Sequence, residues 1–303
     1  SFGETVTALA AEYPEIVVLD ADLAAATKTG IFKKAYPERF FDCGIAECNM
    51  VGVAAGLATC GKIPFAASFA MFSAGRAFEQ VRNSVGYPKL NVKIVGSHAG
   101  ISVGEDGATH QCCEDIALMR TIPGMVILNP CDHYEMQAAV RAAVEHKGPC
   151  YIRLGRLAVE SINNNDDYKF ELGKGITLRE GTDITVVATG LMVQEAVKAA
   201  DALKEEGISV EVINIHTIKP LDEKLVIASA KKTGRVITVE EHNIIGGLGE
   251  AVSTALSEHC PTPVTRIGVN DVYGHSGPAV DLLKEFGLSA EHIAEVIREK
   301  LAK

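Results

Sequence analysis

Short runs of β-branched and other apolar residues alternate with amphipathic stretches along almost the whole chain, and this alternation limits the folds open to it. In the first half, strand-like runs occur at IVVLD (16–20), IPFAAS (63–68), VKIVGS (92–97), MVILNP (125–130) and CYIRL (150–154). Between them, apolar residues recur at helical spacing, as in Met50, Val53, Ala54 and Leu57. This alternation predicts a mostly parallel sheet whose two faces are covered by helices.

A polar stretch rich in turn-forming residues interrupts the pattern over residues 159–182. A second set of strand-like runs follows it, at 183–190, 208–215, 235–241 and 264–269. We therefore predict an α/β protein of two doubly wound domains, the second of them Rossmann-like. The first domain would span residues 1–158, the linker 159–182 and the second domain 183–303.

Charge and apolar content exclude several classes of function. The chain has 29 basic and 39 acidic residues, a net charge of −10, which disfavours nucleic acid and anionic membrane surfaces as partners. Its apolar stretches fall short of the roughly 20 residues that a membrane helix needs. The N-terminal stretch lacks the features of a signal peptide. The eight cysteines show no paired metal-ligand spacing, so we expect reduced thiols, no metal site on this chain and a cytoplasmic location.

The segment SHAGISVGEDGATHQ (97–111) carries the strongest functional signal. It follows a predicted strand, and its three glycines prevent a continuous helix, so it predicts a loop at the C-terminal end of a strand, where α/β sheets bind ligands. The loop contains His98, Asp106 and His110. Two imidazoles and a carboxylate can bind a polyol and transfer protons near neutral pH. The alternative is a solvated loop that contains two histidines by chance.

Two further segments of the first domain combine residues suited to a flat heterocycle. Glu47 is a lone carboxylate in an apolar run, where a strand passes into a helix. It is either an ordinary residue of a first helical turn or a group that shares a proton with a ligand. Phe69 and Phe72 stand in a segment dense in phenylalanine. Core packing is the default interpretation, and a platform for a stacked ring is the alternative.

Arg153 ends a buried strand, where an unpaired guanidinium would be costly, so it indicates either a bound anion or a structural ion pair. In the second domain, EEHNIIGGLGEA (240–251) places a glycine-rich turn between a strand and a helix. Such a turn could bind phosphate. The glycine spacing is incomplete, however, and a tight structural turn explains it equally well.

Taken together, these segments resemble the thiamine-diphosphate-dependent transketolase family over nearly the whole chain. GIAECNM is similar to the family's G-I-A-E block, Phe69 and Phe72 fall in its aromatic pocket, and GEDGATHQ closely matches its G-E-D-G-P-T-H-Q block. The D-G-x-T-H pattern is shared with deoxyxylulose-phosphate synthase. The E1 β-subunits of 2-oxoacid dehydrogenases share the fold and the glutamate but lack this loop. The two domains then correspond to a pyrimidine-binding domain and a transketolase C-terminal domain.

The resemblance implies roles for individual residues toward the cofactor. Glu47 would hydrogen-bond N1′ of the aminopyrimidine of thiamine diphosphate and begin the proton transfers that activate it. Phe69 and Phe72 would stack on or wall the pyrimidine. Glu47, together with the two loop histidines, would form the catalytic set.

Other residues would bind the substrate. His98 and His110 would contact substrate hydroxyls and phosphate, and Asp106 would bind the C2 hydroxyl of the acceptor. Arg153 would bind phosphate, with Gln111 as a lesser contact.

One phosphate contact departs from the family pattern. Ala26 stands where the family offers a phosphate-binding serine, so Thr27 or Lys28 would have to substitute.

The chain also lacks the family's G-D-G motif, which holds the cofactor's diphosphate through Mg²⁺. The resemblance therefore implies a C-terminal subunit of a split transketolase of the pentose phosphate pathway. Its N-terminal partner chain would carry the diphosphate and most of the contacts to Mg²⁺ or Ca²⁺, and self-association through both domains would give a heterotetramer. The alternatives are half of a 1-deoxy-D-xylulose-5-phosphate synthase, an E1 β-type subunit, or a non-catalytic subunit of the same fold.

Overall fold

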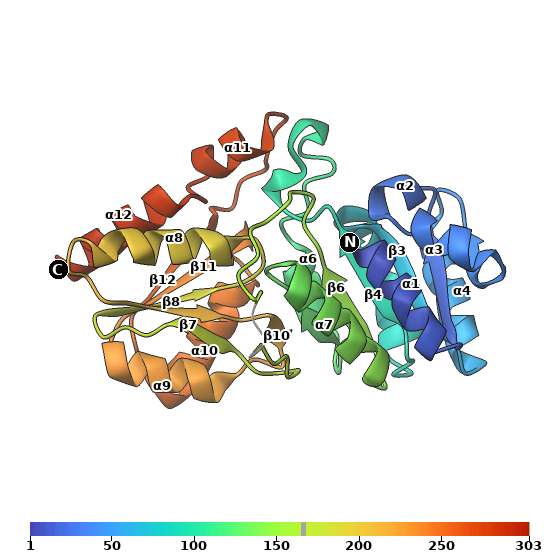
Figure 1. Ribbon diagram of the computed structural model, residues 1–303, viewed down its shortest axis with the longest axis horizontal. Coiled ribbons are helices and arrows are strands. Elements are labelled where there is room, and N and C mark those ends of the chain that lie inside the picture. The colour runs from blue at the N-terminus through green and yellow to red at the C-terminus, as the bar shows by residue number, and fades with distance from the viewer. Residues whose placement is uncertain (165–167, 303) are drawn as a thin grey trace.

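The computed structural model describes residues 1–164 and 168–302, which form two α/β bodies side by side (Figure 1). The first contains a seven-stranded sheet with the order β10-β5-β6-β4-β3-β1-β2. Its strands are β1 (Ile16–Asp20), β2 (Phe40–Asp42), β3 (Ile63–Phe69), β4 (Lys93–Ser97), β5 (Val126–Leu128), β6 (Cys150–Arg153) and β10 (Thr217–Lys219). All of them pair in parallel except β10, which is antiparallel to β5.

Helices cover both faces of this sheet, as the alternating pattern predicts. One apolar layer packs α1 (Phe2–Glu12), α3 (Gly30–Ala35) and α7 (His133–Glu145) against residues such as Val18, Phe65 and Val95. The opposite layer packs α4 (Glu47–Thr59), α6 (Asp115–Arg120) and the helical segment 71–86 against Val17, Leu19 and Ile94. The short elements are α2 (Ala24–Thr27), η1 (Pro37–Arg39) and η4 (Ile101–Asp106).

The helical stripe expected after β3 forms two π-helical turns around a short α-helix. These are η2 (Met71–Arg76), α5 (Phe78–Gln80) and η3 (Val81–Gly86). A π-turn accommodates one extra residue in a helix and is common at functional sites. Here it places Phe72 and Arg76 close to the start of α4.

The second body contains a five-stranded sheet with the order β12-β11-β8-β9-β7. Its strands are β7 (Ile176–Arg179), β8 (Ile184–Ala188), β9 (Val210–Asn214), β11 (Val236–Asn243) and β12 (Val264–Val269). Helices α8 (Met192–Lys204) and α12 (Ala290–Leu301) cover one face, and α9 (Glu223–Thr233) and α10 (Leu248–His259) cover the other. The remaining helix is α11 (Ala279–Glu285). The predicted α/β class with two mostly parallel sheets is confirmed.

Two segments differ from the expected division of the chain. The stretch 159–182, expected as a linker, contributes β7, which pairs antiparallel with β9 at the edge of the second sheet; its residues 165–167 lie outside the described part. The segment 217–219, expected within the second domain, crosses over as β10 and pairs with β5 of the first sheet. Pairing between distant segments leaves no local periodicity in the sequence, so the pattern alone did not reveal this connection.

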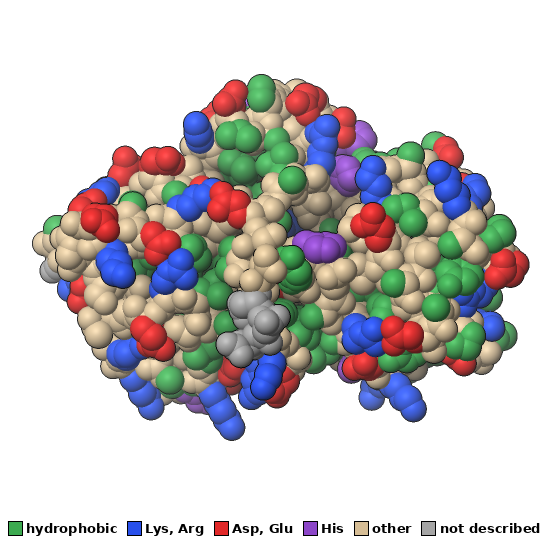
Figure 2. All heavy atoms as spheres, viewed as in Figure 1, with side chains coloured by type: hydrophobic (Ala, Val, Ile, Leu, Met, Phe, Trp, Pro, Cys, Tyr) green, Lys and Arg blue, Asp and Glu red, His purple; other side chains and the backbone are tan. Residues whose placement is uncertain are grey.

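The surface is mixed in charge, with acidic and basic side chains interspersed over the visible face and histidines near the hollow between the two bodies (Figure 2). Among the described residues, the helices all fall short of the length and apolar character needed to cross a bilayer.

Candidate functional site

Glu47 is the first residue of α4, and its side chain is 2% exposed. Its Oε2 lies 2.9 Å from an Nη of Arg76, whose side chain is half-exposed. Arg76 also lies over the ring of Phe72, with Cζ 4.5 Å from the ring centroid. The carboxylate and the phenyl ring therefore contact the same guanidinium, although Glu47 and Phe72 are far apart in the sequence.

Four aromatic side chains form a cluster beside this group: Phe69, Phe72, His98 and His110, hereafter the ring cluster. Phe69 ends β3 and stacks on His98, with ring centroids 4.1 Å apart. Phe72 stacks more distantly on Phe69 at 6.1 Å, and His110 meets the edge of Phe72 at 5.3 Å. The structure thus brings together the residues that the resemblance assigned to a flat ring and those it assigned to the substrate.

His98 takes a left-handed backbone conformation, with φ of 54°, directly after β4. Its Nδ1 lies 3.1 Å from Ser97 Oγ. Burial lowers the pKa of His98, and the charge of Arg156 lowers it further. The ring is therefore held neutral at physiological pH, when it can both donate and accept a hydrogen bond.

The segment 97–111 forms the expected loop, and its three glycines all have φ near +80°, which stops regular helix (φ 86° at Gly100, 82° at Gly104, 73° at Gly107). Asp106 is exposed at its tip. The second body supports the loop, because a Cβ at Gly107 would lie 2.5 Å from Ser276 Oγ. Gln111 is 4% exposed, and its amide donates to the carbonyls of Ile101 and His275. This position favours a structural role for Gln111, in which it holds the loop in place. It is less consistent with the substrate contact that the resemblance implied.

Arg153 forms an ion pair with an acid of the protein itself. Its side chain is 4% exposed, and Nε donates to Asp115 Oδ2 at 2.8 Å. An Nη donates to the carbonyl of Glu241 at 2.8 Å. A residue inside a buried strand directs its side chain into the protein, and here Arg153 meets an acid of α6. The geometry favours the alternative interpretation, a structural ion pair, over phosphate binding.

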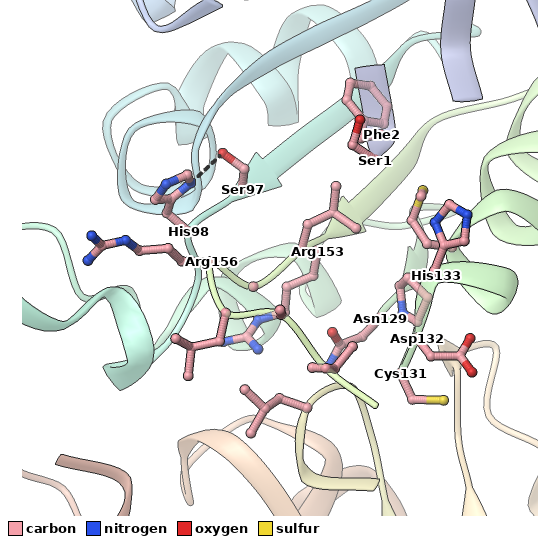
Figure 3. Close-up of a pocket in the computed structure, with 18 of the residues that line it drawn as sticks. Ser1, Phe2, Ser97, His98, Asn129, Cys131, Asp132, His133, Arg153 and Arg156 are labelled. Atoms are coloured by element: carbon pink, nitrogen blue, oxygen red, sulfur yellow. Dashed lines mark hydrogen bonds between the residues drawn. The ribbon is translucent and has the colours of Figure 1, made fainter. Parts of the chain in front are cut away.

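A cavity of about 510 Å³ opens between the two bodies, next to the ring cluster (Figure 3). Its walls come from the N-terminus of α1, the segment 26–28, His98, the start of α7 and residues 153–159. Besides Arg153, the cations Lys28 and Arg156 line it, together with the imidazoles of His98 and His133 and the acids Asp132 and Glu241. A terminal anionic group of a ligand would be favoured here, despite the acidic character of the whole chain.

Arg156 is the residue that sequence reasoning missed. It lies beyond the end of β6, its side chain is 41% exposed, and it approaches His98 in Figure 3. It pairs with Glu105 at 2.8 Å and donates to the carbonyl of Val103. The available signal was its position in the sequence, because residues past the C-terminal end of a parallel strand reach the ligand-binding edge of the sheet.

Lys28 reaches the same cavity because a buried carboxylate shapes its loop. Asp20 ends β1 and accepts hydrogen bonds from the hydroxyls of Thr27 and Thr29, each at 2.7 Å. It also accepts from the backbone N–H of Leu23 at 2.6 Å. Lys28, between the two threonines, has φ of 67° and lines the cavity.

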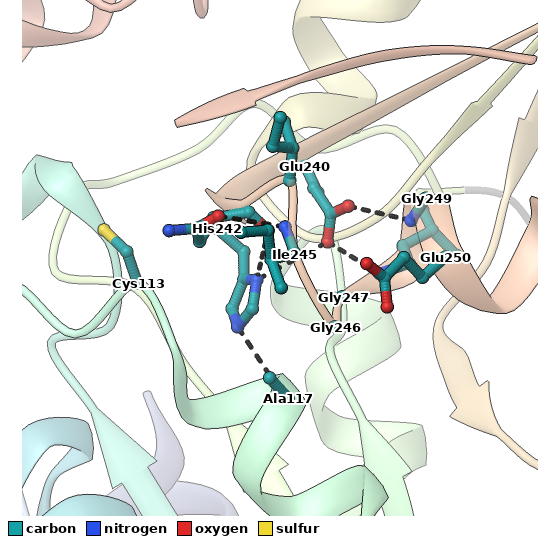
Figure 4. A network of polar contacts seen from close by, with 12 residues as sticks. Cys113, Ala117, Glu240, His242, Ile245, Gly246, Gly247, Gly249 and Glu250 are labelled. Carbon is teal, nitrogen blue, oxygen red and sulfur yellow. Dashed lines mark hydrogen bonds and ion pairs between the residues drawn. The ribbon is translucent and has the colours of Figure 1, made fainter. Parts of the chain in front are cut away.

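The glycine-rich turn at 246–249 is occupied by a side chain of the protein itself (Figure 4). Glu240 accepts from the backbone N–H groups of Leu248 and Gly249 at 2.6 and 2.8 Å, and burial raises its pKa to about 7. His242 accepts from the N–H of Ala117 in α6, which ties the two bodies together. The amides that a phosphate would use are therefore bonded to Glu240, and the turn is structural.

Within residues 1–164 and 168–302, no group of three or more His, Cys, Asp or Glu side chains could hold a metal ion.

Residues 1–161 match the family model of the transketolase pyrimidine-binding domain, and residues 173–293 match that of the transketolase C-terminal domain. The chain belongs to the transketolase family. Members of this family generally use thiamine diphosphate and a divalent metal ion.

Similar proteins include separate subunits of the family. The chain is 52% identical over 304 residues to a Methanocaldococcus jannaschii protein named for the C-terminal section of a transketolase, covering 100% of this chain and 95% of that protein. It is 47% identical to the 6-deoxy-6-sulfo-D-fructose transketolase subunit SqwH of Clostridium sp. (strain MSTE9), covering 98% and 93%. A solved structure described as a split gene transketolase, inactive β4 tetramer, superposes with a TM-score of 0.92 and 51% identity, covering 99% and 97%.

Proposed function

We propose that this chain is the C-terminal subunit of a two-chain transketolase. With a partner chain that carries the diphosphate-binding domain, it would transfer a two-carbon ketol unit between a ketose and an aldose phosphate. The observation that carries this proposal is the meeting of Glu47, the ring cluster and the loop 97–111 at one edge of the first sheet. These parts suit a flat cofactor ring beside a polyhydroxylated substrate.

The residues present fit an aminopyrimidine. Glu47 accepts a hydrogen bond from the guanidinium of Arg76, and the ring of Phe72 lies beneath the same flat, cationic group, so a flat ring with N–H groups can meet the same two partners. Glu47 would exchange a proton with the ring nitrogen N1′, and Phe69 and Phe72 would hold the ring plane. When bound, thiamine diphosphate supplies the carbon nucleophile that carries the ketol unit.

Loop residues would orient the sugar and move its protons. His98, held neutral by burial, would donate to or accept from a substrate hydroxyl, and His110 would do so from the opposite side of the ring cluster. Asp106, exposed at the loop tip, would accept from the C2 hydroxyl of the acceptor.

A substrate anion would lie in the cavity between the two bodies. We assign its binding to Arg156 and Lys28 in place of Arg153, because the guanidinium of Arg153 is committed to Asp115. Phosphate and sulfonate end groups carry the same kind of oxygen acceptors, and one of the similar subunits is named for a sulfonated sugar. Both classes therefore belong in a substrate panel.

The partner would bind the diphosphate and supply most of the ligands to Mg²⁺ or Ca²⁺. Two similar proteins are named as a section or a subunit, and the similar solved structure is described as a split gene product. We propose a heterotetramer in which two copies of this chain associate with each other and with two partner chains. The pentose phosphates are the first substrates to test.

The test is ketol transfer from xylulose 5-phosphate to ribose 5-phosphate, with thiamine diphosphate and Mg²⁺, by this chain alone and with a candidate partner. We expect activity only from the mixture. The Glu47→Gln variant should assemble normally, as checked by size-exclusion chromatography, but lose activity.

Near-parental activity of Glu47→Gln would refute the role of that residue, and activity of this chain alone would refute the need for a partner. Condensation of pyruvate with glyceraldehyde 3-phosphate, in place of ketol transfer, would identify the synthase half instead. If the mixture catalyses neither ketol transfer nor this condensation, a non-catalytic subunit is favoured.

A further inference from the structure

Arg76 contacts two residues of the candidate site, but the proposed function assigns no role to Arg76 itself. It is the last residue of the π-helical turn η2, and its side chain is 49% exposed. One Nη lies 2.9 Å from Glu47 Oε2, and Cζ lies 4.5 Å from the centroid of Phe72. The same guanidinium thus binds a buried carboxylate and lies over one ring of the ring cluster.

These are the two groups that the proposed function assigns to the aminopyrimidine. A ring stacked on Phe72 must approach to within a few ångströms of the face that the guanidinium covers. A hydrogen bond from such a ring to Glu47 competes with the bond from Arg76. A cofactor ring that takes the covered face of Phe72 and bonds to Oε2 of Glu47 therefore excludes the Arg76 side chain from these positions.

We propose that Arg76 is a gate residue that occupies the aminopyrimidine position and must swing out for the cofactor ring to bind. The proposal rests on the proposed function. A guanidinium is flat and cationic and carries several N–H donors, so it imitates a protonated aminopyrimidine toward both partners. Arg76 also compensates the buried charge of Glu47, which would be costly if left without a partner.

The position of Arg76 makes its displacement inexpensive. Its side chain is half in solvent, so a displaced guanidinium can be rehydrated without crossing the protein interior. Because Arg76 is half-exposed, water weakens both its ion pair and its cation–π contact, and together they would reduce the affinity for a competing ring about threefold to tenfold. The gate would therefore lower the affinity for the cofactor without abolishing binding.

The experiment measures binding of a cofactor fragment, 4-amino-5-hydroxymethyl-2-methylpyrimidine, to this chain by NMR titration. We expect Arg76→Ala to bind the fragment about threefold to tenfold more tightly than the parent chain. Arg76→Gln keeps an N–H donor toward Glu47 but loses the charge, and should fall between the two. The matched control is Arg82→Ala, because Arg82 is an exposed arginine on the next helical turn that bonds Asn83. The Arg82→Ala variant should bind the fragment with the same affinity as the parent chain.

The Glu47→Gln variant separates failure of the gate from failure of the proposed function. If the parent chain binds the fragment, Glu47→Gln does not, and Arg76→Ala binds no more tightly than the parent, the gate is overturned and the proposed cofactor site stands. If neither the parent nor any Arg76 variant shows saturable binding, the proposed cofactor site fails, and the gate with it. Circular dichroism melting curves verify that each variant is folded, and Arg76→Gln decides the question if Arg76→Ala is not.

Discussion

Arg153 and Asp115 form an ion pair beneath the loop 97–111, with Nε 2.8 Å from Oδ2 and side chains that are 4% and 0% exposed. The phenol of Tyr151 donates to the same carboxylate oxygen. We predict that Arg153→Ala lowers the free energy of unfolding by about 3–5 kcal/mol, because it leaves a buried carboxylate uncompensated. Guanidinium denaturation measures this change. A loss below about 1 kcal/mol, with a large rise in substrate KM, would return Arg153 to a ligand-binding role.

Arg156→Ala should behave in the opposite way. The side chain is 41% exposed and its partner Glu105 is 67% exposed, so the ion pair contributes little to stability. We expect unfolding free energies within about 1 kcal/mol of the parent, and a KM for phosphorylated ketoses raised about tenfold or more because a charge-assisted contact is lost. Steady-state kinetics of the assembled enzyme provide the measurement. An unchanged KM would remove Arg156 from the anion site.

Gly107→Ala should disturb the loop that carries Asp106 and His110. Its φ of 73° and ψ of −168° lie in a region open essentially to glycine, and an added Cβ would lie 2.5 Å from Ser276 Oγ. The control is Gly61→Ala, where φ is also positive, at 81°, but the Cβ would meet nothing within 4 Å. Gly61→Ala should lose about 1–2 kcal/mol of stability, whereas Gly107→Ala should lose more and should also lose substrate affinity. Equal kinetic effects would mean that the contact with Ser276 does not position the loop.

Stability should fall as the solution becomes mildly acidic, partly because of His216. This residue is buried, its ring stacks on Phe170 at 4.1 Å, and burial lowers its pKa from 6.5 to about 4. Between these two values the unfolded chain binds the proton and the native protein does not, so the free energy of unfolding decreases as pH falls from 6.5 toward 4. The loss reaches about 3 kcal/mol once the pH falls below about 4, where the native protein binds the proton as well.

The His216→Phe variant isolates this contribution, because it keeps an aromatic ring against Phe170 and removes the titrating group. Urea denaturation from pH 7 to pH 4 should give a shallower loss of stability for the variant than for the parent. If the free energy of unfolding depends on pH in the same way in the variant and the parent, His216 does not contribute to the acid sensitivity.

Asp106→Ala should weaken the discrimination of hydroxyl configuration at C2 of the acceptor. The side chain is exposed at the loop tip, so its removal should leave stability nearly unchanged. We expect the ratio of kcat/KM for acceptors of opposite C2 configuration to fall about tenfold, the usual effect of losing a hydrogen bond to a charged group. Glu105→Ala is the neighbouring control and should retain the ratio. A retained ratio in Asp106→Ala would contradict the assignment.

The fold class and the main functional segments could be predicted from the amino-acid sequence. Local periodicity was sufficient for this purpose, since a buried parallel strand requires a run of apolar residues and its covering helix requires a stripe. The positions of the glycines were also sufficient to predict the loop. Gly100, Gly104 and Gly107 have positive φ values, and the segment 97–111 is a loop at the end of β4 as predicted.

The side chains that contact one another could be identified only from the folded chain. Whether Arg153 binds a ligand or an internal acid depends on Asp115, which lies 38 residues away on another element. The ion pair of Glu47 with Arg76, the bond from Gln111 to His275 and the pairing of β10 with β5 likewise join segments that are distant in sequence. Side-chain partners at such separations depend on the packing of helices on sheets, and no pattern within a short window of sequence records that packing.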